Sequence, residues 1–313
     1  MKLKGAIFSQ SQSESTDVLA ECFTRRNIAV KCFYLDQDYI LAGLPIIVRA
    51  NSGEQFHFSE FSFSYGRTWG ETNARLKLHK WVAAFQTEGV TSLDPLNGIL
   101  ANDKKERMMP LFAEAGIPIP KTLVFTTGTH VTQVLNSISE QFACHVVIKA
   151  DGSGGKNISF VHTSDKESVA STVRKYSVDE LLSQALLCQQ YIKSKNANGL
   201  SFHYRAILVF GNLSVLMRFT SASEAELASN MALGGSAELL PANFLSKEEV
   251  VILRNAAAAT SINIAGIDFL KVGGELFVLE VNNSPGLYTA CKLGTEKHLS
   301  DIVTAVETLH LQK

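Results

Sequence analysis

Apolar residues in the first third of the chain occur with two different spacings. Short apolar runs, such as residues 5–9 and 28–35, have the length and composition of β-strands. In residues 16–26 and 73–87 apolar side chains recur every three or four positions, which predicts amphipathic helices. Alternation of strands and helices is typical of an α/β layer with parallel strands. We therefore predict an N-terminal α/β domain over residues 1–100.

The remainder of the chain is richer in paired strands. Residues 101–192 contain strands, helices and a Gly-rich loop, whereas residues 193–313 contain two strand pairs joined by short glycine turns. We expect the first of these turns at Gly211-Asn212 and the second around Gly273. The sequence thus predicts a central subdomain over residues 101–192 and a C-terminal subdomain over residues 193–313, with α+β character in the C-terminal half.

Length and charge limit the functions that need to be considered. A chain of 313 residues exceeds the size that one hydrophobic core usually supports, in agreement with several subdomains. With 29 basic and 30 acidic side chains the formal net charge is −1, so no global field attracts nucleic acid or an anionic membrane. We expect a small molecule or a peptide as the partner, and neither nucleic acid nor a membrane.

Cysteine usage and the N-terminus indicate the compartment. The five cysteines are scattered and never spaced as Cys-x-x-Cys, which argues against a disulfide framework or a zinc cluster. The first residues place a charge on each side of a very short apolar run, which predicts a strand rather than a signal peptide. No apolar stretch approaches the roughly 18 residues of a membrane span. We expect a soluble, cytoplasmic protein.

Acidic side chains interrupt an apolar hairpin near the C-terminus. A two-residue turn would place Asp268 and Glu280 on opposite faces of this hairpin. A three-residue loop over Gly273–Glu275 would instead pair Asp268 with Glu280 and Phe269 with Leu279. We predict the three-residue loop, because it separates an apolar face from a polar one.

In that register the two faces have different chemistry. The predicted core face carries Ile267, Phe269, Phe277, Leu279 and Val281. The other face gathers oxygen-bearing side chains, namely Asp268, Glu280 and Asn282, which are poor core formers unless their charge is neutralised. A hard cation such as Mg2+ with substrate phosphates would do so. The alternative is a buried carboxylate neutralised by a neighbouring lysine or arginine.

A lysine and a Gly-rich loop follow another apolar strand. Lys149 ends that strand, and Gly152, Ser153, Gly154 and Gly155 come after it. Glycines let backbone N–H groups approach phosphate oxygens, and the ammonium adds a point charge. The spacing differs from a Walker A loop and from a Gly-x-Gly-x-x-Gly fingerprint. The sequence indicates a phosphate site or, alternatively, a flexible surface hairpin.

Two arginines and two short segments complete the candidate chemistry. A two-residue turn at Gly211-Asn212 would pair Arg205 with Arg218 on one face, where like charges need an anion between them. This predicts a phosphate or carboxylate clamp, with two solvated arginines as the alternative. Residues 65–70 predict a substrate loop or an ordinary surface loop. The strand end at residues 189–192 could present backbone groups and an amide to an adenine edge.

These segments occur in the order found in the ATP-grasp superfamily, and the sequence most resembles the RimK-like carboxylate-amine (glutamate) ligases. The resemblance covers residues 102–286. Its most specific parts are Gly266-Ile-Asp268 and Glu280-Val-Asn282-Asn-Ser-Pro-Gly286, which are similar to the family's Gly-Val-Asp and Glu-Val-Asn-x-Ser-Pro-Gly. The resemblance implies an ATP-grasp fold with an N-terminal pre-ATP-grasp domain. It also implies Mg2+, or Mn2+ in its place, bound by Asp268, Glu280 and Asn282.

The same resemblance implies a set of ATP contacts. Asn102-Asp103-Lys104 is similar to the family's Arg-Asp-Lys, so Lys104 would contact ATP, and Lys149 matches the second such lysine. The stretch Gln189-Gln190-Tyr191-Ile192 is similar to the adenine hinge Gln-Glu-Tyr-Ile. The remaining implied contacts are the loop residues Gly152, Ser153, Gly154 and Gly155, then His203 at the ribose, and Ser229 and Asn230 at the triphosphate.

The chain departs from the family pattern at four positions. Gln190 replaces a hinge glutamate, and His203 replaces a frequent aspartate. Ala228 and Leu233 stand where related ligases have arginine. The loss of cations at the rim of the site implies a substrate with a different charge pattern.

The implied reaction forms an amide or peptide bond. A carboxylate attacks the γ-phosphate of ATP to give an acyl phosphate and ADP, and an amine then displaces phosphate, with charge offset by Lys149, Arg205 and Arg218. The expected substrates are a small-molecule carboxylate and an amine or peptide, and a homo-oligomer is left open. The alternatives are a small-molecule ligase of the glutathione-synthetase or D-alanine-ligase type, a non-catalytic nucleotide-binding regulatory module, and an ATP-grasp kinase.

Overall fold

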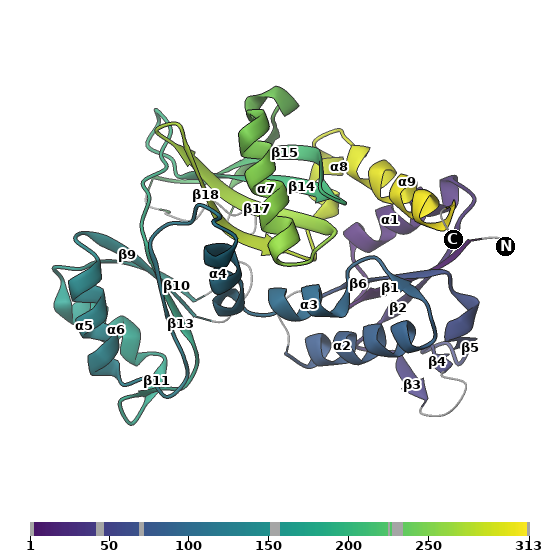
Figure 1. Cartoon of the computed structure of the whole chain (residues 1–313), viewed down its shortest axis with the longest axis horizontal. Coiled ribbons are helices and arrows are strands. Elements are labelled where there is room, and N and C mark those ends of the chain that lie inside the picture. The colour runs from purple at the N-terminus through teal and green to yellow at the C-terminus, as the bar shows by residue number, and fades with distance from the viewer. Residues whose placement is uncertain are drawn as a thin grey trace.

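The computed structural model describes residues 3–41, 47–68, 72–150, 157–224, 226 and 234–311. Three main sheets organise this part of the chain: a parallel N-terminal sheet, an antiparallel central sheet and a larger antiparallel C-terminal sheet. Figure 1 shows the C-terminal sheet lying between the other two. None of the helices in the described residues is long and apolar enough to cross a membrane.

The N-terminal sheet is parallel, as the alternation of strands and helices predicts. Its strands in spatial order are β2 (Ala29–Tyr34), β1 (Lys4–Ser9), β6 (Phe63–Arg67) and β7 (Thr91–Ser92). Helix α2 (Thr72–Thr87) covers one face of the sheet, and α1 (Glu14–Arg25) covers the other. A separate antiparallel sheet contains β3 (Tyr39–Leu41), β4 (Ile47–Arg49) and β5 (Gln55–His57).

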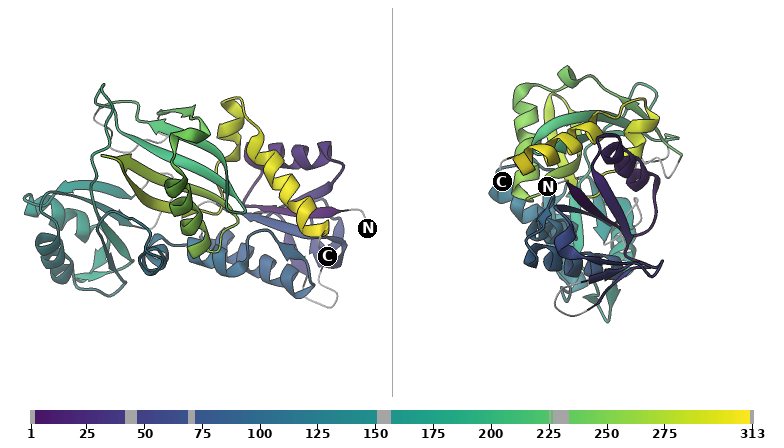
Figure 2. Two further views of the ribbon diagram at one scale, coloured as in Figure 1. Left: turned by 45° about the horizontal axis from the view of Figure 1, so that its top comes forward. Right: turned by 90° about the vertical axis from the view of Figure 1, so that its right-hand side faces the viewer.

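The C-terminal helix completes the core of this N-terminal domain. Helix α9 (Lys297–Leu311) buries Leu299, Ile302 and Val306 against α1 and the parallel sheet. Figure 2 shows α9 lying next to α1, although these helices come from opposite ends of the chain. The N-terminal domain therefore depends on residues far outside the predicted range 1–100.

The expectation of a loop over residues 65–70 is wrong for its first half. Tyr65, Gly66 and Arg67 are the last residues of β6 and are buried, because β6 is a central strand of the parallel sheet. Arg67 is only 2% exposed. The second half, Trp69 and Gly70, lies outside the described residues.

Helices α5 (Val131–Gln141) and α6 (Lys166–Arg174) cover one face of the central sheet, and α4 (Lys105–Glu114) contacts β13 (Leu186–Gln190) on the other face through Leu187. The strands of this sheet in spatial order are β10 (Ile158–His162), β9 (His145–Ala150), β13 and β8 (Thr122–Phe125). Helices α5 and α6 share a core with Val146, Ile148 and Val161 of this sheet. Two very short strands, β11 (Ser177–Val178) and β12 (Leu181–Leu182), form a hairpin beside it. The opposite face of the sheet carries Lys149.

Two helices connect the N-terminal domain to the central sheet. They are α3 (Leu96–Asn102), which spans the predicted boundary at residue 100, and α4 (Lys105–Glu114). The chain turns at Asp103-Lys104, and Lys104 is the N-cap of α4. This turn places the side chains of Lys104 and Lys105 at the start of α4, between the domains.

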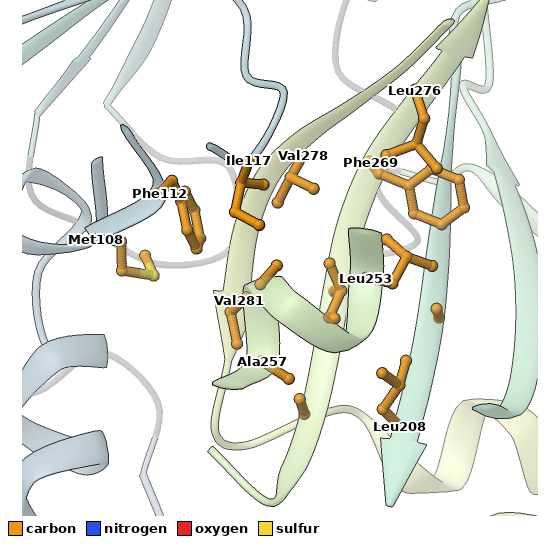
Figure 3. Close-up of a cluster of buried hydrophobic side chains, with 14 of the residues drawn as sticks. Met108, Phe112, Ile117, Leu208, Leu253, Ala257, Phe269, Leu276, Val278 and Val281 are labelled. Atoms are coloured by element: carbon orange, nitrogen blue, oxygen red, sulfur yellow. The ribbon is translucent and has the colours of Figure 1, made fainter. Parts of the chain in front are cut away.

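The C-terminal sheet is antiparallel and packs one face on helices. Its strands in spatial order are β16 (Ser236–Leu239), β15 (Asn212–Thr220), β14 (Phe202–Val209), β17 (Ile264–Val272) and β18 (Glu275–Asn282). Figure 3 shows side chains of α4, such as Phe112, and of α7 (Lys247–Ala259), such as Leu253, packed on Phe269 and Val278 of this sheet. After β18 the chain enters the short helix α8 (Leu287–Lys292).

The hairpin of β17 and β18 has a two-residue turn and a bulge. Val272 pairs with Glu275, and both Gly273 and Gly274 have positive φ, as a tight hairpin turn requires. The predicted three-residue loop is therefore wrong. The pairing of Asp268 with Glu280 is nevertheless confirmed, because an irregularity between Asp268 and Phe269 inserts one extra residue into β18.

The bulge also changes which residues of β18 face the core. Phe269 pairs with Val278 rather than with Leu279. Leu276, Val278 and Val281 are the buried residues, so the predictions that Phe277 and Leu279 lie in the core are wrong. Strict alternation fails at the bulge because its extra residue reverses the side-chain phase.

Candidate active site

Two carboxylates lie side by side on the face of the C-terminal sheet opposite α7. Asp268 of β17 and Glu280 of β18 occupy directly paired positions, and Asn282 donates a hydrogen bond from Nδ2 to Glu280 Oε1 at 3.1 Å. The predicted convergence of Asp268, Glu280 and Asn282 is thus present in the structure. Their roles as metal ligands stay a prediction.

Each carboxylate is paired with a cation. Arg205 of β14 donates from Nε and Nη2 to the two oxygens of Asp268, both at 2.6 Å. The ammonium of Lys105, at the start of α4, lies 3.0 Å from Glu280 Oε2. The alternative of a carboxylate neutralised by a neighbouring lysine or arginine therefore describes both residues. Lys105 is not among the predicted site residues, and its place in the pair Lys104-Lys105 is the signal that the sequence offers for it.

The neighbouring charges favour the ionised forms of Glu280 and Arg205. Burial alone would raise the pKa of Glu280, but Lys105, Asn282 and Lys149 outweigh burial and hold that pKa well below its usual range. Burial would likewise lower the pKa of Arg205, yet the charge of Asp268 and its hydrogen bonds raise it. Because Glu280 stays ionised at neutral pH, its oxygens are available to a hard cation.

The donor set fits a magnesium ion that also binds phosphate. Among the described residues no three His, Cys, Asp or Glu side chains gather closely enough to form a metal site by themselves. Two carboxylates, those of Asp268 and Glu280, and the amide oxygen of Asn282 would together give hard oxygen donors on one sheet face. Mg2+ commonly uses one or two carboxylates and completes its shell with water and substrate phosphate oxygens. The residues present suit that kind of site.

Lys149 extends from the face of the central sheet opposite α5 and α6. Its Nζ donates to Gln189 Oε1 at 2.7 Å, and Gln189 Nε2 donates to Thr122 Oγ1 at 3.0 Å. Burial lowers the pKa of Lys149 to about 8, although Glu280 and Asp268 act in the opposite direction.

The pKa of Lys149 predicts an upper pH limit for the use of ATP. The protonated ammonium is the form that attracts phosphate, and it is lost as the pH rises through about 8. We expect kcat/KM for ATP, which reports the free enzyme, to fall roughly tenfold per pH unit above that value. A Lys149→Arg variant keeps its charge, so its profile should stay flat in this range. Superimposable profiles of the two proteins would contradict the assignment.

The predicted adenine hinge is at the end of β13. Gln190 N donates to Lys121 O at 2.8 Å, and Tyr191 N donates to His145 O at 3.2 Å. The ring of Tyr191 stands edge-on to Phe160, with centroids 5.7 Å apart. Phe160 and His145 lie on the same face of the sheet as Lys149, and the alternation of side chains along β9 and β10 is the sequence signal for this placement. The contact of Gln189, Gln190, Tyr191 and Ile192 with adenine stays a prediction.

The expected pairing of Arg205 with Arg218 is wrong. Arg205 pairs with Met217 and Arg218 pairs with Tyr204, so the two arginines lie on opposite faces of the sheet. The turn is at Phe210-Gly211, one residue earlier than expected, and a register shift follows between Ile207 and Leu208. Arg218 instead forms an ion pair with Glu238 of β16. The shared face that a two-arginine clamp requires is absent.

His203 lies next to the carboxylates. Its ring stacks on Phe219 with centroids 5.1 Å apart, and its Nε2 is 3.9 Å from Asp268 Oδ1. Burial lowers the pKa of His203, against the influence of Asp268, and this favours a neutral ring. Its predicted ribose contact stays a prediction, as does the ATP contact of Lys104, whose Nζ lies 3.9 Å from Glu106.

Several predicted site residues lie outside the described residues. They are Gly152, Ser153, Gly154 and Gly155 of the Gly-rich loop, Ser229 and Asn230 near the triphosphate, and the departures Ala228 and Leu233.

The end of β6 supports the segment that follows Asn282. Tyr65 Oη donates to Asn283 O at 3.3 Å, and the N–H of Thr68 donates to Ser284 Oγ at 2.9 Å. Arg67 Nη2 donates to Pro285 O at 2.8 Å. The N-terminal domain thus holds three consecutive residues next to the candidate metal site.

Comparisons with known proteins show the family and the fold of this chain. The sequence pattern of the RimK-like ATP-grasp domain matches residues 101–303. The chain belongs to the RimK-like ATP-grasp family. This finding confirms the predicted family and, with it, the class of ATP-grasp ligases.

Curated relatives of this family member are named as glutamate ligases. A "Probable alpha-L-glutamate ligase" of Vibrio atlanticus (strain LGP32) is 27% identical over 223 residues, which make up 71% of this chain and 68% of that protein. Further alpha-L-glutamate ligases match over 62–64% of their own length. The chain thus spans about two thirds of the length of the curated relatives it matches.

Solved structures with this fold align over nearly the whole chain. The ATP-grasp ligase PsnB, in complex with a phosphomimetic variant of its minimal precursor, Mg and ADP, has a TM-score of 0.71 at 12% identity, covering 98% of this chain and 99% of PsnB. The macrocyclase MdnC of Microcystis aeruginosa MRC, bound with precursor peptide MdnA, has a TM-score of 0.71 at 14% identity, covering 98% and 100%. The ATP-grasp fold predicted from the sequence is confirmed.

Proposed function

We propose that this RimK-like ATP-grasp protein uses ATP to join a carboxylate to an amine through an acyl phosphate, releasing ADP and phosphate. The observation that carries the proposal is the pairing of Asp268 with Glu280 on one face of the C-terminal sheet, together with Lys149 on the face of the central sheet opposite α5 and α6. A cation and two carboxylates on different sheets are suited to hold a nucleotide phosphate chain and its metal between them.

Asp268, Glu280 and Asn282 would hold Mg2+, or Mn2+ in its place. When bound, the ion would neutralise charge on the phosphates of ATP. The low pKa of Glu280 keeps this carboxylate ionised, so no proton has to leave it before a cation binds. A protein of the same fold is described in complex with Mg and ADP, which supports Mg2+ as the metal.

Lys149 and Arg205 would stabilise the charge that develops during transfer. Lys149 is oriented by Gln189, and its ammonium lies on the face of the central sheet opposite α5 and α6, where we expect the phosphates. Arg205 is held by Asp268 through two of its donors, which leaves further guanidinium N–H groups to contact the phosphoryl group or the oxyanion that forms when the amine attacks. No side chain has to act as a nucleophile in this reaction.

An amino acid and a peptide are the substrate classes that we propose. The curated relatives are named alpha-L-glutamate ligases, and two proteins of the same fold are described with a precursor or a precursor peptide. We infer that this chain adds an amino acid such as glutamate to an amine or to a peptide. A small-molecule ligase would share the same ATP site and would differ only in its acceptor.

Product analysis with pooled substrates tests the proposed function. The purified protein is incubated with ATP, Mg2+ and pools of amino acids with amines or peptides, and nucleotides, phosphate and new amides are quantified. We expect ADP and phosphate to appear in equal amounts with an amide. Release of AMP and pyrophosphate would contradict the acyl phosphate route, and nucleotide binding without turnover in every pool would favour a regulatory module.

A further inference from the structure

An ion pair joins the start of α4 to one of the candidate metal ligands. Lys105 is the first residue of α4, and its Nζ lies 3.0 Å from Glu280 Oε2. The side chains of Lys105 and Glu280 are 30% and 21% exposed, so both are largely withdrawn from water. An ionised carboxylate in such a place is costly when it has no counter-charge. Lys105 supplies that charge to Glu280.

The cation on the neighbouring carboxylate is held in a different way. Arg205 and Asp268 occupy directly paired positions on adjacent strands and form two parallel hydrogen bonds. That geometry is part of the sheet and is rigid. Lys105, by contrast, reaches Glu280 from a helix with a flexible four-carbon side chain and a point charge. Of the two cations, Lys105 is the one that can leave without disturbing a strand.

We propose that Lys105 is the exchangeable counter-ion of Glu280, which it neutralises until a divalent metal ion takes its place. This inference rests on the proposed function, because it takes Glu280 as a metal ligand. Lys105 and the metal compete for the same carboxylate oxygens, so the ion pair lowers the affinity for metal and protects the metal-free fold.

The position of Lys105 also links metal binding to the nucleotide. It follows Lys104, the lysine that we predict to contact ATP, which is the N-cap of α4, and Lys105 is the first residue of that helix. An ammonium displaced from Glu280 would remain at the start of α4, where it could attract the phosphates of a nucleotide bound at Lys104. Lys105 would then contribute its charge to phosphate binding once a metal ion neutralised Glu280.

A single substitution separates this role from a merely structural one. Lys105→Met keeps much of the apolar stem and removes the charge. Lys166→Met is the matched control, because Lys166 is also the first residue of a helix, is followed by a glutamate and is exposed. Mn2+ binding to each full-length protein is titrated by electron paramagnetic resonance, and Tm is measured with and without saturating Mn2+.

Metal should both bind more tightly to Lys105→Met and restore its stability. We expect Mn2+ affinity to rise by roughly tenfold, because the competing ion pair is gone. Without metal the Tm should fall by about 2–4 °C, and saturating Mn2+ should remove that difference because the ion replaces the missing positive charge. Lys166→Met should behave as the parent protein in both measurements.

A Glu280→Gln variant distinguishes the failure of this inference from that of the metal site. If Glu280→Gln loses Mn2+ binding while Lys105→Met binds Mn2+ like the parent protein, the counter-ion role is overturned and the metal site stands. If Glu280→Gln binds Mn2+ as well as the parent protein, both the metal ligand and its counter-ion are overturned. A Tm deficit of Lys105→Met that persists in saturating Mn2+ would also overturn the exchange.

Discussion

Replacing Glu280 with glutamine should lower the rate of ADP formation by at least about a hundredfold. Glutamine has nearly the same shape but no charge, so it neutralises neither a metal ion nor Lys105, which lies 3.0 Å from Glu280. The transferring phosphoryl group would then lose a large part of its electrostatic stabilisation. Steady-state kcat is measured from ADP release over a range of Mg2+ concentrations.

Glu275→Gln is the matched control for this substitution. Glu275 is on the same strand β18 but lies at the exposed end next to the Gly273-Gly274 turn. Its loss should change kcat by less than about twofold, because surface charges away from a site contribute little. Equal kinetics for Glu280→Gln and the parent protein would show that the reaction does not depend on this face of the hairpin.

Replacing Arg205 with methionine should both destabilise the protein and impair catalysis. Asp268 is 7% exposed and both of its oxygens accept hydrogen bonds from Arg205, so the variant leaves a buried carboxylate without its partner. Breaking a buried pair in this way costs about 3–5 kcal/mol. We expect that loss in the free energy of unfolding, measured by urea denaturation, together with a fall in kcat of at least about a hundredfold.

Arg218→Met tests whether catalysis depends only on the face of the sheet that carries Arg205. Arg218 lies on the other face and pairs with Glu238, and the two side chains are 37% and 51% exposed. Exposed pairs contribute at most about 1 kcal/mol, so the unfolding free energy should change by no more than that. We expect little change in kcat. If both arginine variants lost activity to the same extent, the two arginines would have to act on one face after all.

The residues of the candidate metal site were predictable, whereas the path of the backbone that brings them together was not. Asp268, Glu280 and Asn282 are evident as polar residues in apolar strands. A Gly-Gly turn favours a two-residue hairpin, and strict alternation would then place Asp268 and Glu280 on opposite faces. A single bulge in β18 restores their pairing. Burial of Val278 and Val281 against α4 and α7 accompanies it.

In the hairpin of β14 and β15 the backbone irregularity was equally unpredictable, but here it separates the two residues that were expected to pair. Phe210 has a positive φ of 46° and its N–H donates to Asn263 O at 2.6 Å, so a contact with a distant residue accompanies a turn one position earlier than expected. A register shift then moves the pairing by one residue, and Arg218 ends opposite Tyr204. A one-residue change in register reverses the face of every side chain that follows.

By itself, the sequence determined the family, the strand and helix types of the main elements, the parallel N-terminal sheet, and the identity of the acidic pair and of Lys149. These features follow from local periodicity, glycine turns and motif spacing. Only the tertiary structure decided that Arg205 neutralises Asp268, that Lys105 reaches Glu280, and that α9 closes the N-terminal core. The reason is that bulges and ion pairs between distant elements depend on contacts between residues that are far apart in the sequence. A local sequence pattern does not contain these contacts.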